Sequence, residues 1–223
     1  MQTFTTPAPI STVLDIPAGR VRFIAADRAD TTVGVLPADA SKGRDTKAAE
    51  QTTVSLADGV LRIEAPEARN QMFGASGSVE VTVHLPAGSS VRVATADTEL
   101  RASGRLGEVS LESARGSVEL DEAAGARITL SAGDISVGRL TGPGEISTQK
   151  GDITVAEAVR GTVTLRTEQG GITIGAAAGV SASLDAGTGY GRIENSLKNA
   201  DGAAAGLTIH ATTAHGDIVA RSL

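Results

Sequence analysis

The chain has 223 residues, 21% of them charged, and a formal net charge of -6 at neutral pH. This acidic balance argues against nucleic-acid binding, and the lack of cysteine excludes disulfides, thiolate metal sites and cysteine nucleophiles. Hydrophobic residues make up 40% of the chain and aromatic residues only 2%, so we expect a folded core built from small aliphatic side chains.

The first 88 residues are predicted to be β-rich but irregular. Four stretches alternate apolar and polar residues, which is typical of strands with one buried face; they are STVLDIPAGRVRFIAAD, TTVGVLPAD, TTVSLADGVLRIEAP and SVEVTVHLPAGSSVRV. The polar stretch ASKGRDTKAAE is predicted to be a connection with room for one helical turn, and EARNQMFGASG a flexible loop. We expect residues 1–88 to form opening coils or an N-terminal cap that packs on residues 89–223.

From about Ser89 onward, the chain repeats a short template at intervals of about 18 residues. An aliphatic residue opens each unit, a glycine follows five positions later, and in most units a β-branched residue comes two positions after that. The first aliphatic column is Val93, Leu111, Ile128, Ile146, Leu165, Leu184 and Ile209; the glycine column is Gly116, Gly133, Gly151, Gly170, Gly191 and Gly216; the second aliphatic column is Leu100, Val118, Ile135, Ile153, Ile172, Ile193 and Ile218.

These columns favour an all-β, single-stranded β-solenoid. Residues two apart lie on one face of a strand, and stacking such units about 4.8 Å apart aligns equivalent positions into continuous buried columns. Glycine at a constant offset suits a tight corner between strands. The alternative is a β-sandwich, which does not require the same residue type at the same offset in six successive units.

The last two units are longer than the others, and residues 199–206 between them are predicted to be an exposed loop. Because the units follow one another in sequence, we expect the unit that ends in Gly216–Leu223 to lie at the end of the stack, with Val219 on an uncovered strand. An uncovered strand favours pairing with another chain, so we expect a homo-oligomer through this C-terminal edge. The loop 199–206 is the alternative cover.

Three stretches carry a family resemblance. They are the opening FxTPxPIxxxLDIPAGxVRxxAxDRxDTxVxVxPAD, from Phe4 to Asp39, the AxGDIxV-type repeats, and the closing TTAHGDI, from Thr212 to Ile218. Together they resemble the DUF4097 family of bacterial β-strand-repeat proteins, which are commonly labelled adhesins. The resemblance covers nearly the whole chain and implies a β-helix-like solenoid. It implies no catalytic residues, because the family has no agreed catalytic motif. Short members are frequent in actinobacteria, which the alanine-rich composition also suits.

Aspartates beside the corner glycines are the first candidate site. Asp134 and Asp152 occupy the same offset in adjacent units, and Asp217 repeats it later. Stacked carboxylates can share a proton or bind Ca²⁺, but aspartate beside glycine is also a common turn residue. The intervening units carry other residues at this offset, so we predict that these aspartates are neither catalytic nor metal ligands.

Histidines and glycine-rich stretches give no stronger candidate. The spacing of His84, His210 and His215 matches no metal-binding or catalytic motif. The stretch Gly187–Gly191 lacks the following helix of a phosphate loop, and we interpret it as a corner with Tyr190 packed over it. We therefore expect no cofactor and no catalytic residue.

The polar outward positions of the repeats favour a non-enzymatic structural or protein-interaction scaffold, whose partner the sequence does not name. The alternatives are an adhesin-like surface protein, as the resemblance implies, and a carbohydrate-active β-helix enzyme. The latter would need aromatic platforms, which one tyrosine and three phenylalanines do not supply. The N-terminal stretch has neither the basic start nor the continuous apolar run of a secretory signal, and no run is long enough to span a membrane, so we expect a cytoplasmic protein.

Overall fold

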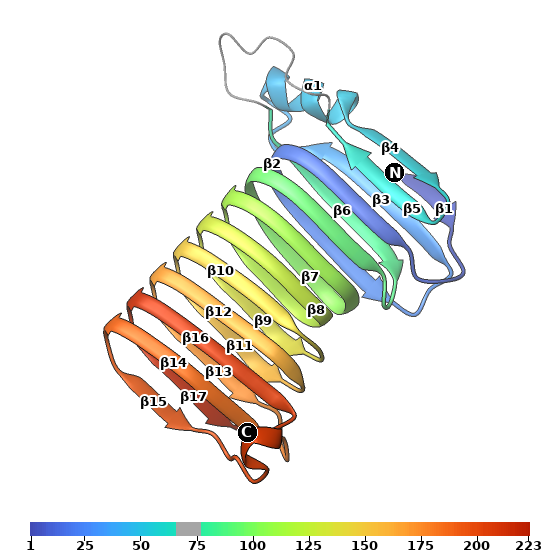
Figure 1. Ribbon diagram of the computed structural model, residues 1–223. Coiled ribbons are helices and arrows are strands. Elements are labelled where there is room, and N and C mark those ends of the chain that lie inside the picture. Colours follow the sequence, from blue (N-terminus) through green and yellow to red (C-terminus); the bar gives the residue numbers. More distant parts are fainter. Residues whose placement is uncertain (66–76) are drawn as a thin grey trace.

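The computed structural model describes residues 1–65 and 77–223, which form a flattened β-solenoid (Figure 1). The strands make one continuous 17-stranded sheet. In chain order the elements are β1 (Gln2–Thr5), β2 (Ser11–Ala26), β3 (Asp30–Pro37), α1 (Gly43–Gln51), β4 (Thr53–Ala57), β5 (Val60–Glu64), β6 (Val79–Pro86), β7 (Ser90–Arg115), β8 (Val118–Ala132), β9 (Ile135–Leu140), β10 (Gly144–Lys150), β11 (Ile153–Ala158), β12 (Gly161–Gln169), β13 (Ile172–Ala176), β14 (Ala182–Tyr190), β15 (Ile193–Ser196), η1 (Gly202–Ala204), β16 (Leu207–His215) and β17 (Ile218–Ser222).

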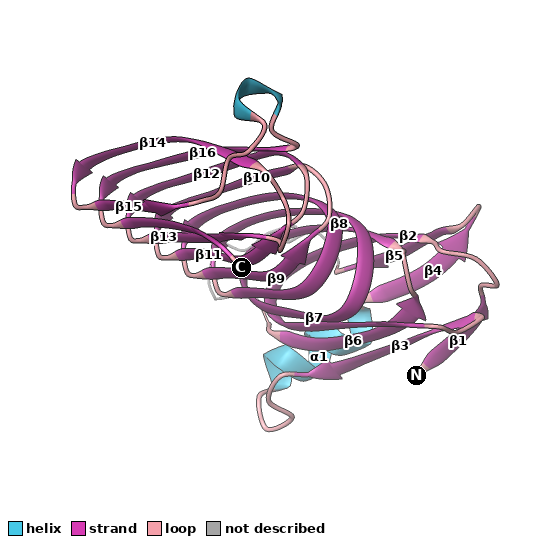
Figure 2. Ribbon diagram, turned by 90° about the horizontal axis from the view of Figure 1, so that it is seen from below, coloured by secondary structure: helices cyan, strands magenta, loops and turns pink. Residues whose placement is uncertain are grey.

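The sheet folds into two layers that face each other, because β2, β7 and β8 bend and run in both (Figure 2). We call the layers sheet I and sheet II. Along the stack, sheet I contains β4, β5, the start of β2, two segments of β7, the end of β8, β10, β12, β16 and β14. Sheet II contains β1, β3, β6, the end of β2, the middle of β7, the start of β8, β9, β11, β13, β17 and β15. The predicted solenoid is confirmed.

The core lies between the sheets and consists of aliphatic columns. The second predicted column is in register throughout, from Leu100 through Ile153 to Ile193. The first column is wrong in its last two members, because Leu165 pairs with Ala211 and Ala211 with Ala186. The residues predicted for those places, Leu184 and Ile209, lie in the neighbouring column with Val163. With alanine as the column residue, the last two units have the same length as the others.

Each coil turns at a residue of the glycine column. The backbone φ angles there run from 128° at Gly116 to 154° at Gly191, a region that side chains rarely allow. Successive corners also stack closely: a Cβ atom on Gly151 would lie 2.1 Å from the carbonyl oxygen of Gly133. Glycine is therefore required at this position by both its φ angle and the space available.

The order of the coils departs from the order of the sequence at the C-terminal end. Strand β16 pairs with β12 and β14, and β17 pairs with β13 and β15. The final coil therefore lies between the two coils that precede it in the chain, as the red strands inside the last orange coil show in Figure 1. The expectation that Gly216–Leu223 forms the end of the stack is wrong. Val219 lies on a strand that is paired on both sides, and the outermost strands are β14 and β15.

Composition explains this order. The inward side chains of the final coil are buried: Leu207, Ile209, Ala211, Ile218 and Ala220 are apolar, and Thr213 donates its hydroxyl to a backbone carbonyl. The outermost coil instead has Asn195 in register with Ala220, at an inward position. The Oδ1 of Asn195 accepts the N–H of Leu197 at 3.0 Å, but between two coils its side-chain NH₂ would be buried without an acceptor, at a cost of about 1–3 kcal/mol. At the end of the stack it is exposed, and Ile193 beside it is 44% exposed rather than buried as predicted.

A connection that leaves the stack makes this arrangement possible. After β15 the chain runs through residues 197–206, which include η1. It then begins β16, one coil further into the stack than β14. Figure 2 shows η1 standing away from the two layers. The predicted exposed loop at 199–206 is thus part of a link between coils, and this link covers the outer edge of β14 only at its start, where Ala182 donates its N–H to Lys198.

Antiparallel strands close the other end. Strand β6 lies between β2, to which it is parallel, and β3, to which it is antiparallel. Strand β1 adds to β3, β4 adds to β5, and α1 packs against β3 and β6. The helix is longer than the single turn predicted for this stretch. The predicted loop EARNQMFGASG lies outside the described residues except for Gly77, and the division at residues 88 and 89 stays a prediction.

Candidate functional site

The corner aspartates form a hydrogen-bond ladder between coils. The carboxylate of Asp134 accepts the backbone N–H of Asp152 at 2.8 Å, and that of Asp152 accepts the N–H of Gly171 at 2.7 Å. Further along the stack, Asp217 accepts the N–H of Arg192 at 2.8 Å. Each aspartate thus satisfies a backbone donor at a place where the chain leaves the sheet. Among the described residues, no group of three or more acidic or histidine side chains is arranged to hold a metal ion.

A threonine column, which we did not predict, supports the same corners. Threonine hydroxyls three residues before the corner glycine donate to the carbonyl oxygen of the corner glycine in the neighbouring coil, on the side of the N-terminal end of the stack. The donor–acceptor pairs are Thr148 with Gly133 at 3.3 Å, and Thr167 with Gly151, Thr213 with Gly170 and Thr188 with Gly216, each at 3.0 Å. The repeated threonine was visible in the sequence, but only the stacked geometry shows that it donates across coils.

Two of the histidines are residues of β16 and contact side chains of the neighbouring strand β14. Nδ1 of His210 is 3.3 Å from a carboxylate oxygen of Asp185, and the ring of His215 stacks on Tyr190 with centroids 5.1 Å apart. The ring of Tyr190 belongs to the last residue of β14 and is 75% exposed. His84 is half-buried on β6, at the other end of the stack. His210 and His215 therefore lie on the same strand, and His84 is far from both.

The glycine-rich stretch before Gly191 belongs to the edge strand β14 and is followed directly by strand β15. No helix begins there, so the helix N-terminus that would bind a phosphate is missing from this part of the described chain. The Gly191 corner has the same close stacking as the others, because its Cβ would lie 2.0 Å from the carbonyl oxygen of Gly216.

Three shallow depressions hollow the outer face of sheet I. The largest has a volume of about 440 Å³ and the other two about 340 and 380 Å³. The latter two share Thr129 and Ser131, so they are continuous. Side chains that line the three include Arg92, Glu108, Ser110, Arg127, Glu145 and Thr164 in the first, Glu112 and Thr129 in the second, and Ser147, Gln149, Arg166, Glu168 and Thr212 in the third.

Opposite charges alternate between neighbouring coils on the outer faces. On sheet I, Arg127 is 3.3 Å from Glu145, and on sheet II, Arg101 is 3.3 Å from Glu119. These side chains are largely exposed, so each pair adds little to stability. The face of sheet I presents its charges among serine and threonine hydroxyls.

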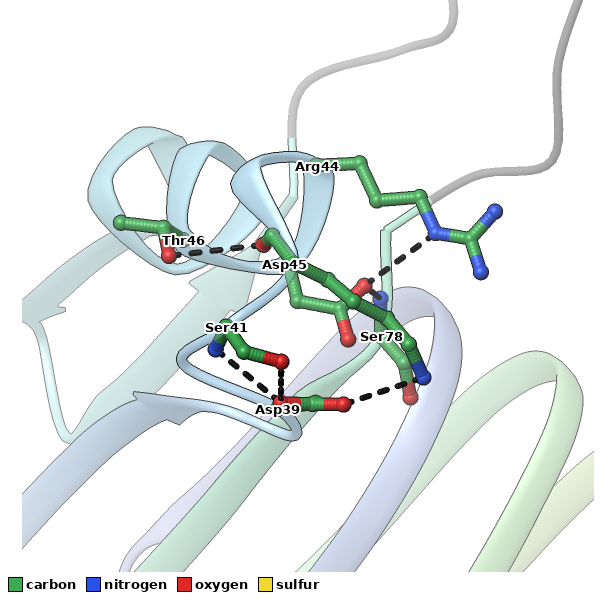
Figure 3. A network of polar contacts seen from close by, with 7 residues as sticks. Asp39, Ser41, Arg44, Asp45, Thr46 and Ser78 are labelled. Carbon is green, nitrogen blue, oxygen red and sulfur yellow. Dashed lines mark hydrogen bonds and ion pairs between the residues drawn. The ribbon is translucent and has the colours of Figure 1, made fainter.

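A second polar cluster fixes α1 to the strands (Figure 3). The buried carboxylate of Asp45 accepts the N–H of Ser78 at 3.0 Å. Asp39 accepts the hydroxyl of Ser41 at 2.6 Å and its N–H at 3.0 Å, and lies 3.2 Å from Lys42. The Ser41 hydroxyl, then its N–H, then Lys42 lower the pKa of Asp39 to about 2. Both aspartates act as anchors, and neither faces a depression on sheet I.

Comparisons with known proteins agree with the fold. The family model Toastrack DUF4097 matches residues 94–220. A "putative adhesin" of Bacteroides fragilis is 12% identical and has a TM-score of 0.56, over 98% of this chain and 95% of that one. A "putative cell adhesion protein" of Clostridium sporogenes is 11% identical with a TM-score of 0.45, over 100% and 98% of the two chains. No curated protein sequence matches. None of the described helices has the length and apolar character to cross a bilayer.

Proposed function

We propose that this chain, which belongs to the Toastrack DUF4097 family, is a non-enzymatic scaffold that binds a partner protein on the outer face of sheet I. The observation that carries the proposal is the run of three open depressions across neighbouring coils of that face, lined largely by charged, hydroxyl and amide side chains. A flat β-sheet face held by stacked coils loses little conformational freedom on binding, so even modest polar contacts can contribute to affinity.

The hydrogen bonds of the corner aspartates support a role other than catalysis. The corner aspartates already accept backbone hydrogen bonds, as Asp134 and Asp152 illustrate. Catalysis by paired carboxylates needs oxygens that are free to exchange protons with a substrate, in a cleft that excludes water. The depressions on sheet I are open, and their charged side chains are arginines and glutamates, of which Arg127 and Glu145 form an exposed ion pair.

The chemistry of the face favours a protein with mixed surface charges. In register along sheet I, Arg127 is followed by Glu145, Thr164, His210 and Asp185. Complementary charge across an interface gives orientation and specificity more than raw affinity. Carbohydrate binding, which a β-helix enzyme would require, has little support, because the one strongly exposed aromatic ring of the described chain, Tyr190, is stacked on His215.

An adhesin-like surface role is the second candidate. It is favoured by the similar structure from Bacteroides fragilis, which is named a "putative adhesin". Both candidates use the same face but differ in where the protein resides. Protease treatment of intact producing cells separates them: loss of the protein favours the adhesin-like role, and full protection favours a scaffold inside the cell.

Site-specific photo-crosslinking tests the proposed face. A photoreactive residue at Gln149, which is exposed in the third depression, should give a discrete adduct in producing cells that proteinase K digests. The matched control carries the same residue at Ser136, which is exposed on sheet II. We expect Arg166→Glu, in the same depression as Gln149, to weaken the adduct. Equal adducts from both faces, or none from Gln149, would overturn the proposal.

A further inference from the structure

The outermost coil leaves two strands paired on one side only. Among the described residues, β14 pairs with β16 alone and β15 pairs with β17 alone. At the start of β14, the N–H of Ala182 donates to the carbonyl oxygen of Lys198 at 3.1 Å, and beyond it the outward N–H and C=O groups of both strands form an open edge. The core also ends here without a cover: Leu184 and Ala186 on β14 are half-buried, and Ile193 on β15 is 44% exposed. A further pair of strands at this end would pair with the free backbone groups and cover the exposed apolar side chains.

The directions of the strands decide which end of a second copy fits. At the N-terminal end, β1 runs in the same direction as the coils, because it is antiparallel to β3 and β3 is antiparallel to β6. Strand β4 runs the opposite way, because it is antiparallel to β5. A head-to-tail contact would therefore need parallel pairing in one sheet and antiparallel pairing in the other. A two-fold contact between two β14–β15 ends gives antiparallel pairing in both sheets.

One register of this two-fold contact keeps like charges apart. Directly opposite residues in an antiparallel pair share a face, so the sum of their numbers is constant along the pair. An axis through Ala186 sets Asp185 opposite Gly187 of the second copy, and an axis through Asn195 sets Glu194 opposite Ser196 of the second copy. Ala186 lies five residues before the Gly191 corner and Asn195 four residues after it. The two residues therefore lie opposite each other in the two sheets to within about one residue, so a single two-fold axis can pass close to both.

We propose that two copies of this chain associate tail to tail through β14 and β15, with the two-fold axis near Ala186 and Asn195. The association is closed, because it uses the same end of both copies and leaves no free C-terminal edge for a third. It joins the two sheets into one longer stack and brings Ile193 of each copy opposite Leu197 of the other. It uses the end of the solenoid, so it is independent of the proposed partner face on sheet I.

The size of the end predicts a weak dimer. A strand of nine residues spans about 30 Å, and with the sheets about 10 Å apart the end offers about 300 Å² between the backbone layers. A standard protein interface uses about 800 Å² of each partner. We therefore expect a reversible monomer–dimer equilibrium in sedimentation velocity across the micromolar range. A chain that stays monomeric up to the highest micromolar concentrations would overturn the proposal.

Charge changes at Ser196 test the register. Ser196→Glu places a carboxylate opposite Glu194 of the second copy, and Ser196→Lys places an ammonium there. Each dimer contains two such contacts, so we expect the dimer dissociation constant to rise about fivefold for Ser196→Glu and to fall about as much for Ser196→Lys. The same two changes at Ser136, exposed on β9, match the change in net charge and should leave the constant unaltered. Equal effects at Ser136 and Ser196 would overturn the register.

A single cysteine tests the axis, since the chain has no cysteine of its own. Residues opposite themselves on a two-fold axis have Cα atoms about 4.5–5.5 Å apart, within the range that a disulfide bridges. Ala186→Cys should therefore give a disulfide-linked dimer under mild oxidation, and Ser136→Cys should not. Failure of Ala186→Cys to crosslink, in a variant that still dimerises by sedimentation, would show that the copies meet elsewhere.

Discussion

The carboxylate of Asp134 lies against the backbone amide of Asp152 in the next coil and accepts its hydrogen bond at 2.8 Å. The same contact recurs one coil further, between Asp152 and Gly171 at 2.7 Å. At a corner the backbone leaves the ladders of both sheets, so its N–H groups need another acceptor. The repeated aspartate supplies that acceptor, which accounts for its position beside glycine in structural terms.

Removing one aspartate should therefore cost stability and not metal binding. For Asp152→Ala we expect the free energy of unfolding to fall by about 1 kcal/mol, because the N–H of Gly171 loses its acceptor. In a chain of this size, that lowers the Tm by about 2–4 °C in a thermal melt. Glu168→Ala, at an exposed position of β12, is the control. A rise in Tm of several degrees on adding sub-millimolar Ca²⁺, lost in Asp152→Ala, would show a metal site and contradict this role.

Substitution by alanine should destabilise the protein far more at a corner glycine than at a glycine within strand β14. Gly151→Ala should cost at least about 3 kcal/mol of unfolding free energy, because φ is 143° and the added Cβ meets the carbonyl of Gly133. Gly187→Ala should change stability by less than about 1 kcal/mol, because nothing lies within 4 Å of its Cβ position. Urea unfolding measures both. Similar losses in the two variants would contradict the role given to the corners.

One aliphatic column allows the same substitution to be compared inside the stack and at its end. Ile153→Asp buries a carboxylate in a position that is 0% exposed, and we expect a loss above about 4 kcal/mol or failure to fold. Ile193→Asp, in the same column on β15, should cost under about 1.5 kcal/mol, because its side chain is 44% exposed. Thermal melts at low protein concentration keep association out of the comparison. If Ile153→Asp melted like the parent protein, the column would be assigned wrongly.

The cluster at α1 should respond to acid through Asp39. The pKa of Asp39 in the folded chain is about 2, below its ordinary value of 3.8, so the folded state binds this proton less readily than the unfolded state. The contribution is fully present above about pH 4 and is lost as the pH falls towards 2. We expect the carboxyl carbon of Asp39 to titrate near pH 2 by NMR, and Asp39→Asn to remove the acid-dependent shift of the Ser41 amide. A midpoint near 4 would show that the contacts with Ser41 and Lys42 do not persist in solution.

Periodicity in the sequence was enough to predict the solenoid, the inward columns and the corners. Side-chain alternation at period 2 and glycine at a constant offset depend only on local backbone geometry, so they can be found without knowing which coils touch. The predicted column is wrong where a small residue takes the place of a large one. Ala186 and Ala211 are the column residues of the last two units, and the larger Leu184 and Ile209, predicted for these places, lie in the neighbouring column.

Local pattern could not predict the order of the coils along the stack. Units with the same register can stack in any order that their connections allow, so the sequence by itself determined which side chains point inward. Only the tertiary structure decided which coil is last. The coil with Asn195 lies outermost, where this side chain is exposed, and the final coil is enclosed by way of the long connection that includes η1. Burial of a polar side chain without all of its hydrogen-bond partners costs free energy, which favours this order. For this reason the open edge lies at β14 and β15, and not at Val219 as the sequence predicted.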